Sequence, residues 1–141
     1  MPSLAPLIKA LDDAQWELSE AFKDLPDEDL WKRPDPRLLS VGELATHIAY
    51  WEARSFLPDT FSTPLLEHAA RYYTVNAQEP ITLNLTAAQL LEEVQRVHAA
   101  SKSALELNPL DSEDPHPTRE GWTWGYTLEY QAFHVAYHTG Q

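Results

Sequence analysis

Apolar residues recur at three- and four-residue spacing along four stretches of the chain, which is the period of an amphipathic helix rather than of a strand. We predict helices over residues 3–23, 41–57, 87–107 and 124–138. Ser40, with Glu43 three residues later, predicts a capping box at the start of the second helix. Thr86 is a candidate N-cap for the third helix. The apolar face of the first helix includes Trp16 together with several leucines.

Prolines and glycines separate these helices. Residues 25–40 are expected to form a loop or short turns, because Pro34 and Pro36 interrupt any helix. A short helix is expected over 65–73, an extended segment over 80–85, and an acidic, proline-rich, exposed connection over 108–121. No stretch has the alternation of a strand, and no internal repeat is visible. We therefore expect one all-α domain over residues 1–141, an antiparallel four-helix bundle with two elaborate connections.

Charge and composition narrow the possible partners. The chain has 22 acidic and 10 basic residues, a formal net charge of −12. A surface that binds nucleic acid or an anionic membrane needs clustered Lys and Arg, so neither partner is expected. The absence of cysteine excludes disulfides, cysteine-ligated zinc and a cysteine nucleophile. The N-terminus does not resemble a signal peptide and no apolar run could span a bilayer, so a cytoplasmic protein is expected.

The last helix carries the first candidate chemistry. His134 and His138 are four residues apart, which places both imidazoles on one helical face, close enough to bind one ion. A polar stripe containing them runs along a helix that is otherwise apolar or aromatic: Thr127, Gln131, His134, His138 and Gln141. A helix that is apolar on most sides is expected to be buried on most sides, so its polar stripe would face the interior, where unpaired polar groups are costly. The alternative is that the stripe is the solvent face of the helix.

His47 in the second helix is the third candidate ligand. It lies next to Leu44, Ile48 and Trp51 on the expected core side, and Trp51 could form a wall of the site. Taken alone, His47 is more often a core histidine that makes one hydrogen bond, and it becomes a candidate ligand because it can face the HxxxH pair of a neighbouring helix. Three neutral imidazoles suit zinc, nickel, iron or copper better than magnesium or calcium. Three protein ligands also leave a position open for water or substrate, as in catalytic zinc sites.

The sequence indicates the remaining polar residues as part of the site less strongly. His98 and His116 are expected to face solvent. His68 lies in a segment without a clear pattern and is not expected to reach the site. Tyr130 and Gln131 are candidates for orienting an imidazole. Glu129 lies off the histidine stripe and is not assigned as a general base, so the catalytic residues remain unknown.

Two motifs together resemble the DinB-like (damage-inducible) metalloprotein family. They are SVGELATH at residues 40–47 and HVAYHTGQ at residues 134–141, and the likeness extends to Leu30-Trp31 before the second helix. The resemblance implies an up-down-down-up bundle, one divalent metal bound by His47, His134 and His138, and frequent homodimerisation. Relatives usually carry a basic residue where this chain has Thr139, and they usually continue the helix beyond the Gly-Gln pair.

The same resemblance implies a class of reaction. Characterised relatives include S-transferases that use glutathione, mycothiol or bacillithiol, and a mycothiol-dependent maleylpyruvate isomerase. We therefore expect a zinc- or nickel-dependent enzyme that joins a low-molecular-weight thiol to a small electrophile, with hydrolysis as a variant. Two alternatives stay open: a non-catalytic metal- or ligand-binding stress-response bundle, and a structural bundle whose histidines satisfy each other.

Overall fold

The computed structural model describes residues 3–66, 79–108 and 110–141, and within them the chain is all-helical. The elements are α1 (Ala5–Ala21), α2 (Asp27–Leu30), α3 (Val41–Phe56), the 3-10 turn η1 (Pro64–Leu66), α4 (Ala87–Leu107) and α5 (Trp124–Thr139). The four long helices lie close to their predicted bounds, and the predicted all-α class is confirmed for the described residues. The short helix predicted over 65–73 lies largely outside them, and residues 80–85 contain no strand.

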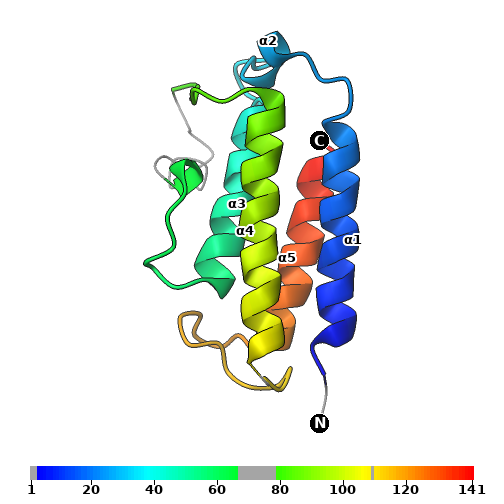
Figure 1. Cartoon of the computed structure of the whole chain (residues 1–141), viewed down its shortest axis with the longest axis vertical. Helices are drawn as coiled ribbons and strands as arrows, with labels where there is room; N and C mark the ends of the chain where they lie inside the picture. The colour runs from blue at the N-terminus through cyan, green and yellow to red at the C-terminus, as the bar shows by residue number, and fades with distance from the viewer. Residues whose placement is uncertain (1–2, 67–78, 109) are drawn as a thin grey trace.

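The long helices lie side by side and differ in direction (Figure 1). In this view α1 and α5 run upward, whereas α3 and α4 run downward. α1 packs against α5, α3 packs against α4, and α3 also contacts α5. The contact between α3 and α5 is the one that brings the candidate histidines together.

Both predicted helix starts are confirmed. The Ser40 hydroxyl accepts a hydrogen bond from the Glu43 backbone N–H, and the Glu43 carboxylate accepts one from the Ser40 N–H. Thr86 and Gln89 form the same reciprocal pair at the start of α4. Each box satisfies two backbone donors that the first helical turn leaves without partners.

Glu43 also joins α3 to the connection that precedes it. Its carboxylate forms a 2.6 Å ion pair with Arg33, and both side chains are almost completely buried. Burial by itself raises the pKa of Glu43, but the hydrogen bonds from Arg33 and the backbone N–H groups lower that pKa below its usual value. The carboxylate is therefore charged and paired at neutral pH, which fixes where α3 begins.

The core is formed mainly by aliphatic side chains from all four long helices and α2, together with Phe22 and Phe56. Its fully buried members include Leu11, Leu30, Ile48, Leu90, Leu128 and Val135. Trp16 does not belong to it: the side chain is 59% exposed, because the core-facing positions of α1 are occupied by Ala14, Gln15 and Leu18. The expectation that α5 is buried on most sides is also wrong. Four of its aromatic side chains are 42–60% exposed: Tyr126, Tyr130, Phe133 and Tyr137.

A polar network lies in the middle of the bundle and includes His98, which we expected to face solvent. His98 Nδ1 lies 2.9 Å from a Glu52 carboxylate oxygen, and His98 Nε2 lies 2.6 Å from Asp12. Gln15 donates a further hydrogen bond to Glu52, and Lys102 donates one to Asp12. The prediction was wrong because the partners of His98 come from α1 and α3, far away in the sequence.

Candidate metal centre

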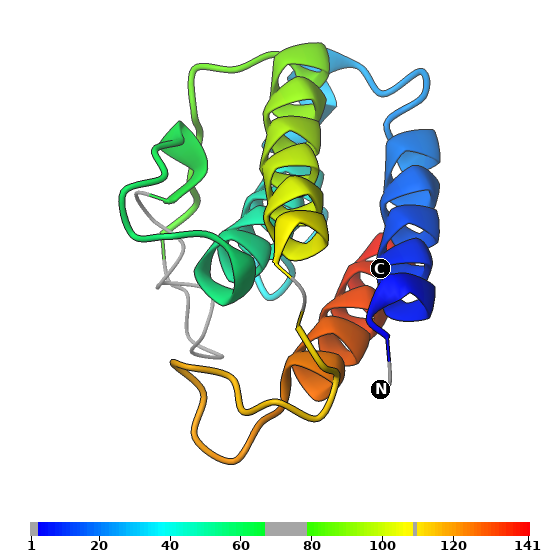
Figure 2. The same cartoon turned by 60° about the horizontal axis from the view of Figure 1, so that its bottom comes forward.

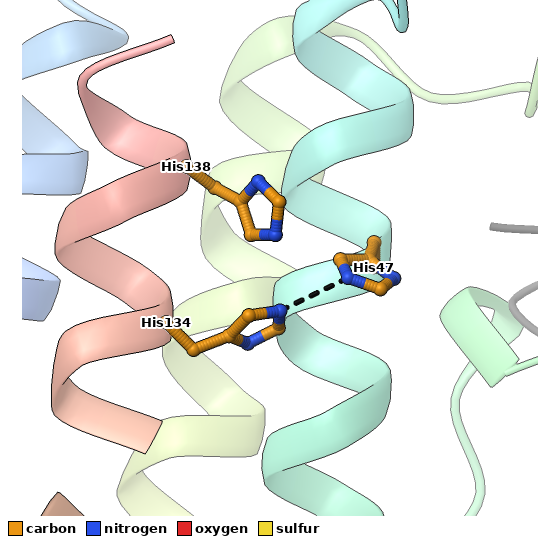
Figure 3. A group of neighbouring side chains, drawn as sticks. All are labelled: His47, His134 and His138. Atoms are coloured by element: carbon orange, nitrogen blue, oxygen red, sulfur yellow. Dashed lines mark hydrogen bonds between the residues drawn. The ribbon is translucent and has the colours of Figure 1, made fainter. Parts of the chain in front are cut away.

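Three histidines from two helices converge at one point between α3 and α5. Figure 3 shows His134 and His138 reaching from α5 toward His47 on α3. The Nε2 atoms of His134 and His47 are 2.9 Å apart. The ring centroid of His138 lies 4.9 Å from that of His47 and 4.5 Å from that of His134. One potential ligand atom from each residue can be chosen so that all three lie within 4.8 Å of one another.

The polar stripe of α5 faces the interior of the bundle, which is one of the two interpretations of its sequence; the other is that it faces solvent. Thr127 and Gln131 are almost completely buried, and the Gln131 amide donates a 3.3 Å hydrogen bond to the backbone carbonyl of Ile48 on α3. The position expected to orient an imidazole therefore joins the two helices instead. The Tyr130 ring lies parallel to the His134 ring, with centroids 6.4 Å apart.

Burial controls the protonation of this cluster. Desolvation, followed by the charge of His138, lowers the pKa of His47 to about 4. Desolvation, followed by the charges of His47 and His138, lowers the pKa of His134 to about 3. Both imidazoles are therefore neutral at pH 7, which is the state in which a histidine can bind a metal.

Gln141 fixes the orientation of the third histidine. Its side-chain oxygen lies within hydrogen-bonding distance of His138 Nδ1, and because an amide oxygen can only accept, Nδ1 carries the proton. The lone pair of His138 is then on Nε2. A hydrogen bond to the non-ligating nitrogen is the usual support for a metal-binding histidine. The sequence placed Gln141 on the polar stripe but did not indicate this contact.

The arrangement fits a tetrahedral transition-metal ion. Metal–nitrogen distances of about 2.0–2.1 Å place neighbouring ligand nitrogens about 3.3 Å apart in such a site. The separations here, 2.9 Å for one pair and at most 4.8 Å overall, lie on either side of that value. Small side-chain rotations would therefore bring the three nitrogens around one ion. The Nδ1 atom of His134 is buried and makes no hydrogen bond within the described part of the chain. Rotation of this imidazole toward a metal ion would therefore break no hydrogen bond at Nδ1.

A cavity of about 710 Å³ opens beside the histidines. Besides the three histidines, its lining consists of Trp51, Arg119, Glu120, Trp122, Tyr130, Gln131, Phe133 and Tyr137. The predicted position of Trp51 on its wall is confirmed. The residues from the connection before α5 were missed, because that segment is acidic and proline-rich and has no periodic pattern. The volume is in the range of sites for small organic ligands.

The other histidines lie elsewhere. His116, which we expected to face solvent, is 6% exposed, and its Nε2 lies 2.7 Å from the backbone oxygen of Ser55 on α3. It is buried because the connection between α4 and α5 folds back onto the C-terminal end of α3 (Figure 2). His68 lies outside the described residues. Glu129 is exposed on α5 and is not part of the cavity wall.

A bundle of helices with three histidines beside an open cavity defines a class of candidate metalloproteins, and comparison with known proteins identifies the family. The chain matches the family model of the DinB superfamily over residues 10–141. It belongs to the DinB superfamily, as its two histidine motifs indicated. Searches of curated proteins and of solved structures each found no significant match. None of the described helices has the length and apolar composition that a membrane span requires.

Proposed function

We propose that this protein is a metal-dependent transferase that joins a low-molecular-weight thiol to a small electrophile. The observation that carries the proposal is the combination of three histidines, whose ligand atoms lie within 4.8 Å of one another, with the cavity that opens beside them. Three protein ligands leave a coordination position open, and the cavity gives a substrate access to it. Membership of the DinB superfamily supports the same reading.

In this proposal His47, His134 and His138 are ligands and not acid–base groups. A divalent zinc or nickel ion, when bound, supplies a Lewis acid that lowers the pKa of a coordinated thiol. His47 and His134 are held neutral by burial, and Gln141 holds His138 with Nε2 toward the site. Trp51, Phe133 and Tyr137 give the cavity an apolar wall that suits a small organic electrophile.

We further infer that the four long helices form the up-down-down-up bundle of the family, and that two copies of the chain associate as a homodimer. The directions of the helices in Figure 1 support the first inference. Family membership supports the second. Sedimentation of the purified protein would measure its oligomeric state.

Two other functions remain in competition. A non-catalytic metal- or ligand-binding bundle is favoured by the scarcity of bases: among the described residues of the cavity wall, Glu120 is the single carboxylate. A structural role for the histidines is favoured by the 2.9 Å contact between His47 and His134. A purely structural role does not explain why His138 lies beside the other two histidines or why a cavity adjoins them, so we prefer a metal site.

The test is thiol conjugation by zinc- or nickel-loaded protein. Glutathione, bacillithiol and mycothiol are each offered with 1-chloro-2,4-dinitrobenzene, which accepts the sulfur and releases chloride. We expect acceleration with at least one thiol, lost in His134→Ala and kept in Glu129→Gln, an exposed position on the same helix. Activity that survives in His134→Ala would refute the metal-dependent mechanism. Background rates with every thiol on metal-loaded protein would favour the non-catalytic alternative.

A further inference from the structure

Arg119 occupies a fixed position on the wall of the cavity. Its Nη2 donates a 2.9 Å hydrogen bond to the hydroxyl of Ser55, which is buried on α3. Its guanidinium carbon lies 5.3 Å from the centre of the Trp51 ring and 4.6 Å from that of Trp122. A cation held against two aromatic rings is already oriented before a ligand arrives, so binding costs less conformational entropy.

The segment that carries Arg119 is itself anchored. Pro115 and Thr123 form an antiparallel bridge, and the His116 N–H donates a 2.8 Å hydrogen bond to the Trp122 carbonyl. The Trp122 N–H in turn donates to the Arg119 carbonyl, which closes a turn. The buried His116 ring contacts α3 at Ser55, the same residue that receives the Arg119 hydrogen bond. Arg119 thus lies in a hairpin-like turn held against the C-terminal end of α3.

The cavity wall has two chemically different parts. Arg119 is the single Lys or Arg among the described residues that line it, whereas most of the other wall residues are aromatic or histidine. A guanidinium matches a carboxylate or a phosphate with paired hydrogen bonds. Glu120 lies on the same wall, and the chain carries a net charge of −12. Both negative charges weaken the binding of a doubly charged phosphate more than that of a singly charged carboxylate.

We propose that Arg119 is a specificity-determining residue that binds the carboxylate of a small apolar carboxylic acid, whose hydrocarbon body packs against Trp122, Tyr130 and Phe133. A molecule bound in this way extends from Arg119 toward the histidines, which line the same cavity. The electrophile of the proposed transfer is then an apolar carboxylate, and this last assignment rests on the proposed function. Recognition of the carboxylate itself requires neither thiol nor metal.

The test measures binding to wild type, Arg119→Gln and Arg119→Lys by isothermal titration, with chelator-treated and with zinc-loaded protein. The probes are phenylacetate, its neutral isostere phenylacetamide, and glutathione, which carries carboxylates without an aromatic body. Arg37→Gln is the matched control, since Arg37 is 88% exposed and pairs with Asp35 outside the cavity. Circular dichroism verifies that each variant is folded.

We expect wild type to prefer phenylacetate over phenylacetamide, and Arg119→Gln to bind phenylacetate about 10- to 100-fold more weakly, as for loss of a hydrogen-bonded charge. Arg119→Lys falls between the two, phenylacetamide binding is unchanged, and the Arg37→Gln variant matches wild type.

Three results would overturn the proposal: no preference of wild type for phenylacetate, equal phenylacetate binding by Arg119→Gln, or an effect confined to glutathione, which would assign Arg119 to the thiol. Binding to chelator-treated protein separates the two proposals. If phenylacetate binding to chelator-treated protein depends on Arg119 while no thiol is transferred, carboxylate recognition is supported and the transferase function is refuted. If phenylacetate binds only to zinc-loaded protein and is insensitive to Arg119, the metal holds the carboxylate and Arg119 does not.

Discussion

The lone pair of His138 points toward the other two histidines because of a side chain three residues further along the chain. The Gln141 side-chain oxygen accepts a hydrogen bond from the Nδ1–H of His138 and so selects the tautomer whose Nε2 lone pair can coordinate a metal. Without this partner the ring could rotate or carry its proton on the other nitrogen. At the scale of single residues, the candidate metal centre therefore depends on Gln141 as well as on the three histidines.

Replacing Gln141 with alanine tests this dependence. We expect zinc affinity to fall about 10- to 100-fold, the usual effect of removing a residue that orients a metal ligand. Competition against a chromogenic chelator measures the change. Gln95→Ala, an exposed position on α4, is the control and should bind zinc like wild type. Equal affinities in Gln141→Ala and wild type would contradict the orienting role.

At the scale of elements, the start of α3 determines where His47 is placed. Gly42 packs directly beneath the Trp31 indole, and a Cβ built there would lie 2.5–2.8 Å from three of its ring atoms. Such a contact is far inside van der Waals distance, so a larger residue must displace either the indole or the helix. The capping box at Ser40 and the Arg33–Glu43 pair fix the same helical turn.

We predict that Gly42→Ala lowers the free energy of unfolding by about 1–3 kcal/mol, the usual cost of overpacking a core. Urea denaturation measures this change. Gly140→Ala is the matched control, because its φ is −73° and the nearest atom to an added Cβ is 3.5 Å away. It should change stability by less than about 0.5 kcal/mol. Equal effects of the two substitutions would contradict the account of the Trp31 contact.

The helices themselves could be predicted from the sequence, because caps and hydrophobic periodicity are local. Ser40 and Thr86 begin their helices where their side chains indicated. Residues whose environment depends on distant segments could not be placed. His98 meets Asp12 across 86 positions of sequence, and His116 meets Ser55 across 61. The three candidate metal ligands could still be proposed. His134 and His138 have the spacing of one helical face, and His47 lies in a motif that resembles the family.

The exposed aromatic face of α5 shows a different limit. An apolar helix predicts burial, but a helix at the edge of a bundle can bury only the side that faces its neighbours. α5 packs on α1 and α3, so Leu128 and Val135 are fully buried while Phe133 is 60% exposed. Tyr130, Phe133 and Tyr137 line the cavity instead. Composition could not distinguish a core residue from a cavity wall.

At the scale of the whole molecule, the network around His98 makes stability depend on pH. Burial by itself lowers the pKa of His98, but hydrogen bonds and charges from Glu52 and Asp12 outweigh it and raise the pKa above 6.5. The protonated imidazolium joins α1, α3 and α4. Its contribution is complete below pH 6.5, where the unfolded chain is also protonated, and is lost as the pH rises through the raised pKa.

The stability advantage of wild type over His98→Gln should therefore be largest below pH 6.5 and shrink at higher pH. Denaturation of both proteins between pH 5 and 9 measures this difference. His47 and His134 titrate in both proteins, so their opposite effect on stability cancels in the comparison. An advantage that stays constant or grows with pH would contradict a charged His98.

The three candidate histidines come from helices that are far apart in the chain. His47 and His134 are 87 positions apart, and the contact between α3 and α5 brings them within 2.9 Å. An ion bound by both would bridge these helices and stabilise the folded state, because it binds the assembled site and not the unfolded chain. The proposed chemistry therefore depends on the contact between α3 and α5.

The most direct test is the metal content of untagged protein purified without metal-affinity resin, measured by mass spectrometry for wild type and His134→Ala. The account predicts about one zinc or nickel ion per wild-type chain, as expected for a single three-histidine site, and its loss in the variant. Metal absent from both proteins, or retained at the same level in His134→Ala, would contradict the metal centre.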